Sequence, residues 1–126
     1  MSRTRAQRTG DDAEERVLKH LRRKGRHRCL ARNYSSRGGE VELITLEGEL
    51  LVFVEVRARS RTGYGRPEDT VDHRKRRRLA QAAQAFLAGH PEHVEPACRF
   101  DVVAVDGDGL RWIADAFRPF ETGFWS

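Results

Sequence analysis

Cysteine and long apolar runs are scarce in this sequence of 126 residues. Its two cysteines, Cys29 and Cys98, are too few for a disulfide framework, and their spacing matches no zinc-binding pattern. The longest uninterrupted aliphatic and aromatic run extends only from Leu50 to Val54, whereas a membrane-spanning helix requires about 20 apolar residues. No apolar segment typical of a signal peptide follows the first residues. We therefore expect a protein that does not span a membrane, carries no secretion signal and works in the reducing cytoplasm.

Lysine is also rare, since it supplies three of the 24 cationic side chains and arginine supplies the rest. The distribution of charge is more informative than the net value of +5. Residues 40–56 contain five Glu and no cation, between residues 1–39 with 12 cations and 4 anions and residues 57–78 with 9 cations and 3 anions. Such basic flanks suit phosphate binding around a cation-holding acidic cluster, although charge blocks also occur on simple solvated faces.

The spacing of apolar residues predicts the element order helix, three strands, helix, two strands. We expect helices over about 11–24, capped by Asp11 or Asp12, and over 70–88, and strands over 28–32, 41–46, 50–58, 100–105 and 110–114. A glycine-containing loop is expected over 60–67. This order predicts one α/β domain over residues 10–118 with a mixed sheet between helices, a flexible basic arm over 1–9 and an aromatic tail over 119–126.

Glu55 stands inside the apolar strand that begins at Leu50, where an uncompensated charge is costly, so it requires a partner. A tight turn at Glu47–Gly48 would place Glu42 opposite Phe53 and Glu40 opposite Glu55, with the three carboxylates on one face. A divalent cation is one reason to gather them. The alternative is an ion pair of Glu55 with Arg57, which shares its face, or with another strand, and no metal.

Glu14 borders the apolar stripe of the first predicted helix, which Ala13, Val17, Leu18 and Leu21 form. From that position a glutamate can reach inward over the edge of the sheet. It can equally be a first-turn acid that complements the helix dipole.

Six consecutive basic or histidine side chains, His73–Arg78, stand near the start of the second predicted helix. Cations there oppose the helix dipole, which a phosphate partner would offset. The phosphate-binding candidates are Arg74, Lys75, Arg77 and Arg78 in this run and Arg59, Arg61 and Arg66 in the preceding loop. Those that point away from any groove would instead form a solvated outer face.

Several segments together resemble the YraN family, an uncharacterised bacterial family with a restriction-endonuclease-like fold, similar to archaeal Holliday junction resolvases. They are Thr9–Asp11, Glu14, Leu21, Asn33, Gly38–Ile44, Val52–Arg59, Gly65, Lys75 and Arg99–Val103. The most specific part is Gly-Gly-Glu-x-acid-Leu-Ile followed at this separation by Phe-Val-Glu-Val-basic. The resemblance runs from about Thr9 to Phe117 and implies a three-layer PD-(D/E)xK nuclease fold, with helices flanking a mixed central sheet.

The resemblance also implies roles for individual residues. Glu42 falls at the metal-binding acid, Glu55 at the acid of the ExK element, Arg57 at its lysine and Glu14 at the helical glutamate of the resolvase-like branch. The expected metal ligands are Glu42, Glu55 and Glu40, holding Mg²⁺ or Mn²⁺ that activates a water for phosphodiester hydrolysis. The function expected from this resemblance is that of a structure-selective endonuclease that cuts DNA, including branched DNA. Its expected form on the substrate is a homodimer.

Two positions depart from this pattern. Glu42 stands where aspartate is usual, and its extra methylene moves the carboxylate by about a bond length. Arg57 stands where lysine is usual, and a guanidinium keeps its proton, so it can stabilise charge but not act as a general base. Lys75 could supply an amine from another direction. The alternative function is therefore a non-catalytic nucleic-acid-binding module that retains the nuclease fold, with a structural adaptor ranked last.

Overall fold

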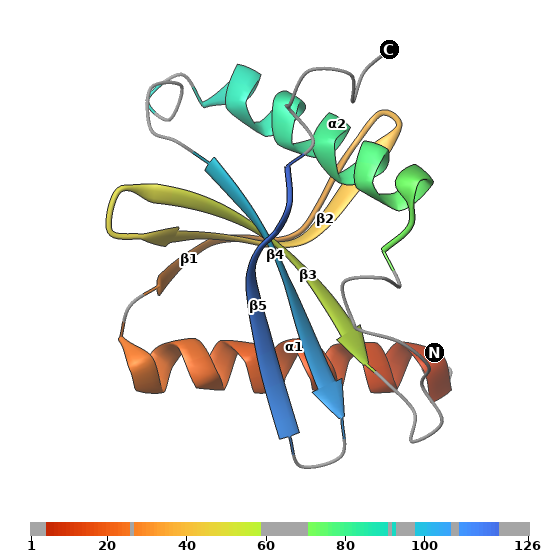
Figure 1. The fold of residues 1–126 in the computed structure, drawn as a ribbon, viewed down its shortest axis with the longest axis vertical. Helices are drawn as coiled ribbons and strands as arrows, with labels where there is room; N and C mark the ends of the chain where they lie inside the picture. Colours follow the sequence, from red (N-terminus) through yellow and green to blue (C-terminus); the bar gives the residue numbers. More distant parts are fainter. Residues whose placement is uncertain are drawn as a thin grey trace.

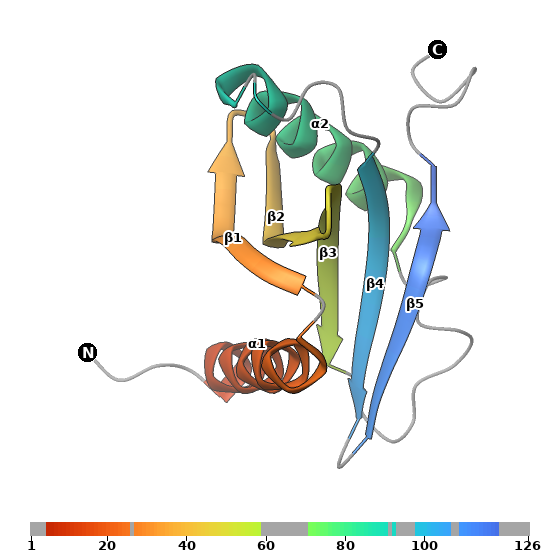
Figure 2. The same ribbon diagram turned by 90° about the vertical axis from the view of Figure 1, so that its left-hand side faces the viewer.

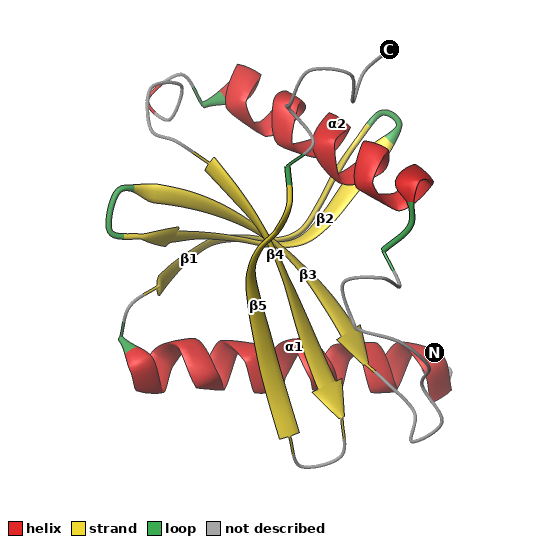
Figure 3. Cartoon of the chain, viewed as in Figure 1, coloured by secondary structure: helices red, strands yellow, loops and turns green. Residues whose placement is uncertain are grey.

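The computed structural model describes residues 5–25, 27–58, 71–90, 92, 98–106 and 109–118, the side chains of 5–11, 58 and 106 excepted. It contains the elements α1 (Arg5–Lys24), β1 (His27–Ser36), β2 (Gly39–Glu47), β3 (Leu50–Ala58), α2 (His73–Gly89), β4 (Cys98–Asp106) and β5 (Gly109–Phe117) (Figure 3). This confirms the expected element order. Within these ranges, no helix combines the length and apolar character that crossing a membrane requires.

The five strands form one mixed sheet in the order β1-β2-β3-β4-β5. β3 and β4 pair in parallel, whereas the other three pairs are antiparallel. Helix α1 lies on one side of the sheet and α2 on the other (Figures 1 and 2). The expected α/β class with a mixed sheet between helices is thus confirmed, and the arrangement is compatible with a restriction-endonuclease-like fold.

Alternation along β3 builds a separate core under each helix. Leu51 and Phe53 pack on the α2 side with Leu79 and Phe86, and ring contacts join Phe53 to Phe86. On the other face, Val52, Val54 and Val56 pack with the α1 residues Ala13, Val17, Leu18 and Leu21. The apolar stripe predicted for the first helix is therefore its buried face, and Glu14 stands within it.

The helices begin at other residues than the sequence predicts. Helix α1 begins at Arg5 rather than at Asp11 or Asp12, because no proline intervenes and a single glycine, Gly10, costs only about 1 kcal/mol in a helix. Helix α2 begins at His73, after Asp72, whose side chain accepts a hydrogen bond of 2.9 Å from the backbone N–H of Lys75. That N-cap places Lys75 in the first turn.

The predicted register of the β2–β3 hairpin is wrong. Glu47 pairs with Leu50, so the turn is centred on Gly48–Glu49, and Phe53 lies opposite Ile44 rather than Glu42. Gly48 has a φ of 63°, which suits the first central position of a primed turn, whereas the predicted turn would put Glu47 there. Because the partner changes by an even number of residues, each side chain keeps the face that was predicted for it.

Two glycines bring β2 against α2. Gly38 takes a φ of 81° in the β1–β2 turn. At Gly39, which is buried, a Cβ would lie 2.7 Å from the backbone nitrogen of Ala82 and would also collide with the carbonyl oxygen of Arg78. The absence of a side chain therefore lets β2 start in contact with the α2 backbone, next to the helix turn that carries Lys75.

Asp101 ties β5 to the parallel pair. Its buried carboxylate accepts hydrogen bonds from Arg99 Nε at 2.8 Å, from Trp112 Nε1 at 2.7 Å and from the backbone N–H of Asp115 at 2.9 Å. Asp115 itself has a φ of 53°. Charge-assisted hydrogen bonds of this kind hold the edge strand and so support β4 beside β3.

Candidate active site

The candidate site lies where β2 and β3 separate, which we call the fork. The β2–β3 pairing ends at Leu43 opposite Val54, just before Glu42 and Glu55 along the two strands. From their common hairpin the strands diverge, β2 toward α2 and β3 toward the N-terminal end of α1 (Figure 1). β3 meanwhile stays paired with β4 as far as Ala58. A backbone gap therefore opens at the position of the two carboxylates.

Side chains from four elements meet at the fork. Glu14 comes from α1, Glu42 from β2, Glu55 from β3 and Lys75 from α2. Glu14 is 4% and Glu55 is 2% exposed to solvent. The charges of Glu55, Glu14 and Lys75 all act on Glu42, and the charge of Lys75 also acts on Glu55. The structure thus brings together the three glutamates that the sequence singled out for catalysis, although not in the predicted register.

Burial and mutual repulsion disfavour ionisation of these carboxyls. Burial, followed by the charges of Glu55 and Glu14, raises the pKa of Glu42 to about 8, although Lys75 and a hydrogen bond from the backbone N–H of Val56 act in the opposite direction. Burial also raises the pKa of Glu55, against the lowering effect of Lys75 and Arg57. Such perturbed carboxyls gathered at one place are typical of functional sites.

The pKa of Glu14 is raised by burial as well, and only partly restored by Arg32 and a hydrogen bond with Asn33. Asn33 has a φ of 51° in β1. Asparagine tolerates that left-handed conformation better than most residues. Few other residues could therefore adopt this backbone conformation and also hydrogen-bond with Glu14.

Two carboxylate oxygens at the fork have no hydrogen-bond partner among the residues described. They are Oε1 of Glu14 and Oε2 of Glu55. Buried polar atoms without a partner are rare in folded proteins, and an all-oxygen set of this kind matches the preference of Mg²⁺ and Mn²⁺. The donor chemistry therefore fits such a cation.

The ligands are not preassembled for a metal ion. Within the described ranges, no three His, Cys, Asp or Glu side chains lie close enough together to coordinate one, so the carboxylates would have to rotate toward a bound cation.

Lys75 is the cation in closest contact with Glu55. Its Nζ lies 3.4 Å from Oε1 of Glu55 and 3.6 Å from Oε1 of Glu40, whereas Nε of Arg57 lies 3.9 Å from Oε1 of Glu55. The alternative ion pair between Glu55 and Arg57 is therefore present but longer. Sequence reasoning placed Lys75 among the phosphate-binding residues and also considered that it could supply an amine from the second helix. The N-cap at Asp72 places Lys75 in the first turn of α2, within reach of Glu55.

Glu40 lies on the outer side of the site. Its side chain is 49% exposed, and it is paired with Lys75 and with Arg78, whose guanidinium nitrogen lies 3.4 Å away. It is not opposite Glu55, as the predicted register required, and it faces the first turns of α2 instead.

The basic run at the start of α2 divides between several environments. Arg74 and Arg77 are exposed, and Arg78 is paired with Glu40. Arg76 instead lies 5.1 Å from the centre of the Phe117 ring, and its Nε donates a hydrogen bond to a backbone carbonyl. An exposed basic stripe thus borders the fork on the α2 side. The other predicted phosphate-binding residues, Arg59, Arg61 and Arg66, lie outside the described residues.

Known proteins match most of this chain. The model of the family described as "Uncharacterised protein family UPF0102" matches residues 13–105. A UPF0102 protein of Halorhodospira halophila is 50% identical over 109 residues, which cover 86% of either chain. A UPF0102 protein of Ralstonia nicotianae is 48% identical over 113 residues (86% of this chain, 85% of the other), and one of Pseudomonas entomophila is 44% identical over 114 residues (86% and 92%). The matched range contains the whole fork.

Proposed function

Because the chain belongs to the uncharacterised protein family UPF0102, the YraN family that its motifs resemble, we propose its function from the chemistry of the fork. The proposed activity is metal-dependent hydrolysis of phosphodiesters in DNA, with selectivity for branched structures. The observation that carries it is the meeting of two buried glutamates, Glu14 and Glu55, with the partly exposed Glu42, all three with raised pKa values, beside a lysine; two of their oxygens have no hydrogen-bond partner among the described residues. Such a group is unfavourable for stability and suits a site that holds a cation.

Glu42 and Glu55 would hold the metal, with Glu14 next to them and Glu40 at the outer rim. A bound Mg²⁺ or Mn²⁺ would supply Lewis-acid polarisation of the phosphate and a water of lowered pKa. The carboxylates of Glu42 and Glu55 would hold such a cation at the fork. Because Glu14 comes from another element than Glu42 and Glu55, closure of the site requires α1 to stay docked on the sheet.

Lys75, in this proposal, supplies the ammonium that the resemblance assigns to position 57. It lies closer to Glu55 than Arg57 does, and it can offset negative charge as that charge develops on the phosphate. We expect Lys75→Gln to lower the cleavage rate by about 100-fold or more, and Arg57→Gln to lower it less. Equal losses in the two variants would contradict this assignment of roles.

DNA would approach along the exposed basic stripe of α2. Arg74, Arg77 and Arg78 follow one another at helical spacing next to Lys75, and phosphate contacts of this type position a strand without reading its sequence. Selectivity for branched structures rests on the resemblance to the resolvases.

The experiment is incubation of the purified protein with labelled four-way, flap and linear DNA in Mg²⁺, in Mn²⁺ and in EDTA. We expect metal-dependent cutting that Glu55→Gln abolishes and that Glu49→Gln preserves, because Glu49 is exposed at the hairpin turn, away from the fork. Cutting that persists in Glu55→Gln would show that the site is elsewhere.

The alternative, a non-catalytic nucleic-acid-binding module, is favoured by one observation. Lys75 and Arg57 both lie within ion-pair distance of Glu55, so protein cations already neutralise part of the cluster. Salt-sensitive DNA binding without cleavage in any of the metals would establish this function in place of the nuclease.

A further inference from the structure

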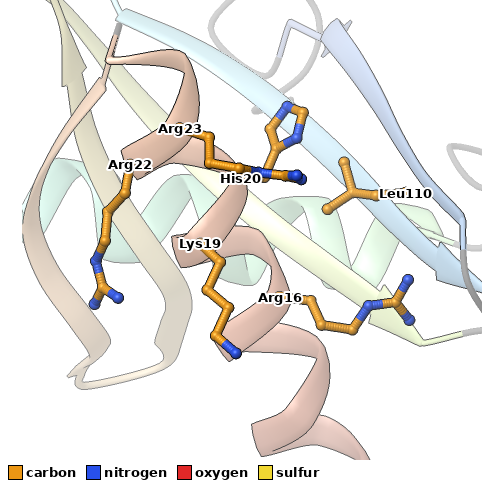
Figure 4. A pocket seen from close by; sticks show the side chains of 6 residues that line it. All are labelled: Arg16, Lys19, His20, Arg22, Arg23 and Leu110. Carbon is orange, nitrogen blue, oxygen red and sulfur yellow. The ribbon is translucent and has the colours of Figure 1, made fainter.

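A second basic surface lies on α1, beyond the fork. The stretch from Arg16 to Lys24 contains five cations and no acidic residue. A hollow of about 580 Å³ is lined there by Arg16, Lys19, His20, Arg22, Arg23 and Leu110 (Figure 4). Arg16 and Arg23 extend along the side of α1 that faces Leu110 of β5, whereas Arg22 points to the other side. We call the residues lining this hollow the α1 surface.

The hollow continues toward the aromatic side chains of β1 and β5. A neighbouring hollow of about 570 Å³ shares His20 and Arg23 with the first and reaches Trp112 and His27. The ring of His20 is stacked on that of Trp112, with 6.1 Å between ring centres. Flat rings thus stand at one end of the row of cations.

Three cations of the α1 surface have no acidic partner in the part of the chain that the structure describes. Lys19, Arg22 and Arg23 are exposed and make no ion pair with a described acidic group. The pKa of His20 is lowered by burial and then by the charges of Lys24 and Arg23, as expected in a positive potential. The helix dipole accounts for the cations of the last turn, which are Arg22, Arg23 and Lys24, but not for Lys19.

We propose that the α1 surface binds the phosphate backbone of a nucleic acid, at a place separate from the segment held at the fork. At 1.5 Å per residue, Arg16, Lys19 and Arg23 span about 10 Å of the helix axis. This corresponds to about three phosphates of one strand of B-DNA. The inference does not depend on catalysis at the fork, since it concerns another surface.

The neighbouring rings and the predominance of basic residues around the hollow favour a nucleic acid over a lipid surface. Nucleobases stack on aromatic rings, and His20 and Trp112 present such rings beside the cations. A membrane-binding helix would instead expose large apolar side chains, whereas Leu110 is the one apolar member among the six residues of the first hollow.

The test compares two charge-matched double variants by fluorescence anisotropy with a labelled 20-nucleotide strand and a 20-base-pair duplex, in EDTA. Lys19→Gln/Arg23→Gln alters the α1 surface. Arg28→Gln/Arg111→Gln removes two exposed cations from the edge strands β1 and β5. Circular dichroism and thermal melting establish that both variants are folded.

We expect the α1 variant to bind about 5-fold or more weakly, with the slope of log K against log salt reduced by about 1–2, since each lost phosphate contact removes about 0.7–0.9. The edge-strand variant should bind within about 2-fold of the native protein, because the cations that it lacks lie outside the row that follows α1.

Indistinguishable binding by the two variants would overturn the inference. The inference would also be overturned if the native protein bound anionic lipid vesicles as tightly as DNA and the α1 variant lost that binding. Because EDTA removes any cleavage, failure here is separate from failure of the proposed nuclease.

Discussion

The sharpest stability prediction concerns Glu42→Gln, which replaces a carboxyl at the fork by an amide of the same shape. In the folded protein the pKa of Glu42 is about 8, against an ordinary value of 4.5. Below pH 4.5 both the folded and the unfolded state hold the proton, and the group has no effect on stability. Between 4.5 and about 8 only the folded state holds it, so stability falls as the pH rises, by about 1.4 kcal/mol per pH unit. Above pH 8 the full penalty remains.

At pH 7 this amounts to a destabilisation on the order of 3 kcal/mol, which the amide avoids while its carbonyl oxygen can still accept the hydrogen bond from Val56. We therefore expect Glu42→Gln to be more stable than the native protein, by a margin that grows from pH 5 to pH 8. The assay is urea unfolding in EDTA at each pH, with Glu49→Gln as the control for loss of an exposed charge. Parallel pH profiles for native protein and Glu42→Gln would refute the reasoning, because they would mean that Glu42 ionises freely.

Three further stability changes can be measured by the same unfolding assay or by thermal melting. Gly39→Ala should destabilise by about 1–3 kcal/mol or more, because its Cβ would collide with the α2 backbone, whereas Gly89→Ala, which meets open space, should change stability by less than about 1 kcal/mol. Equal effects of the two would contradict the close approach of β2 to α2. Asp101→Asn should cost about 3–5 kcal/mol, since an arginine, an indole and a backbone amide donate to that carboxylate. Asp72→Ala should cost about 1 kcal/mol through loss of the α2 N-cap.

The strands could be predicted well where local chemistry decides them. The run Leu50–Ala58 has the bounds that the sequence indicates, because a continuous apolar segment follows a glycine turn. The common face of Glu42 and Glu55 was also predictable, since the side-chain period of two survives an even shift of register. The register was not predictable, because a turn centred on Glu47–Gly48 and one centred on Gly48–Glu49 both contain Gly48. The positive φ of Gly48 shows that it occupies the first central position of the turn.

The proximity of Lys75 to Glu55 lies beyond local reasoning. It results from the close contact at Gly39, which brings β2 to α2, and from the cap that begins the helix at His73. The contact at Gly39 depends on how elements far apart in the sequence pack, whereas the cap at Asp72 is local and fixes which face of the helix carries Lys75. The charge of residues 1–39 includes the cations of α1, but only the three-dimensional structure shows that they line a hollow together with Leu110 of β5.

The most direct test of the account is a calorimetric titration of the protein with Mn²⁺ at pH 7.5. We predict saturable binding at one site, at least 10-fold weaker in Glu42→Gln and in Glu55→Gln, since loss of a ligand or of its support typically weakens a metal site by about 10–100-fold. Glu49→Gln should bind as the native protein does. Absence of saturable binding, or binding that neither Glu42→Gln nor Glu55→Gln weakens, would contradict the claim that the fork is a site for a divalent cation.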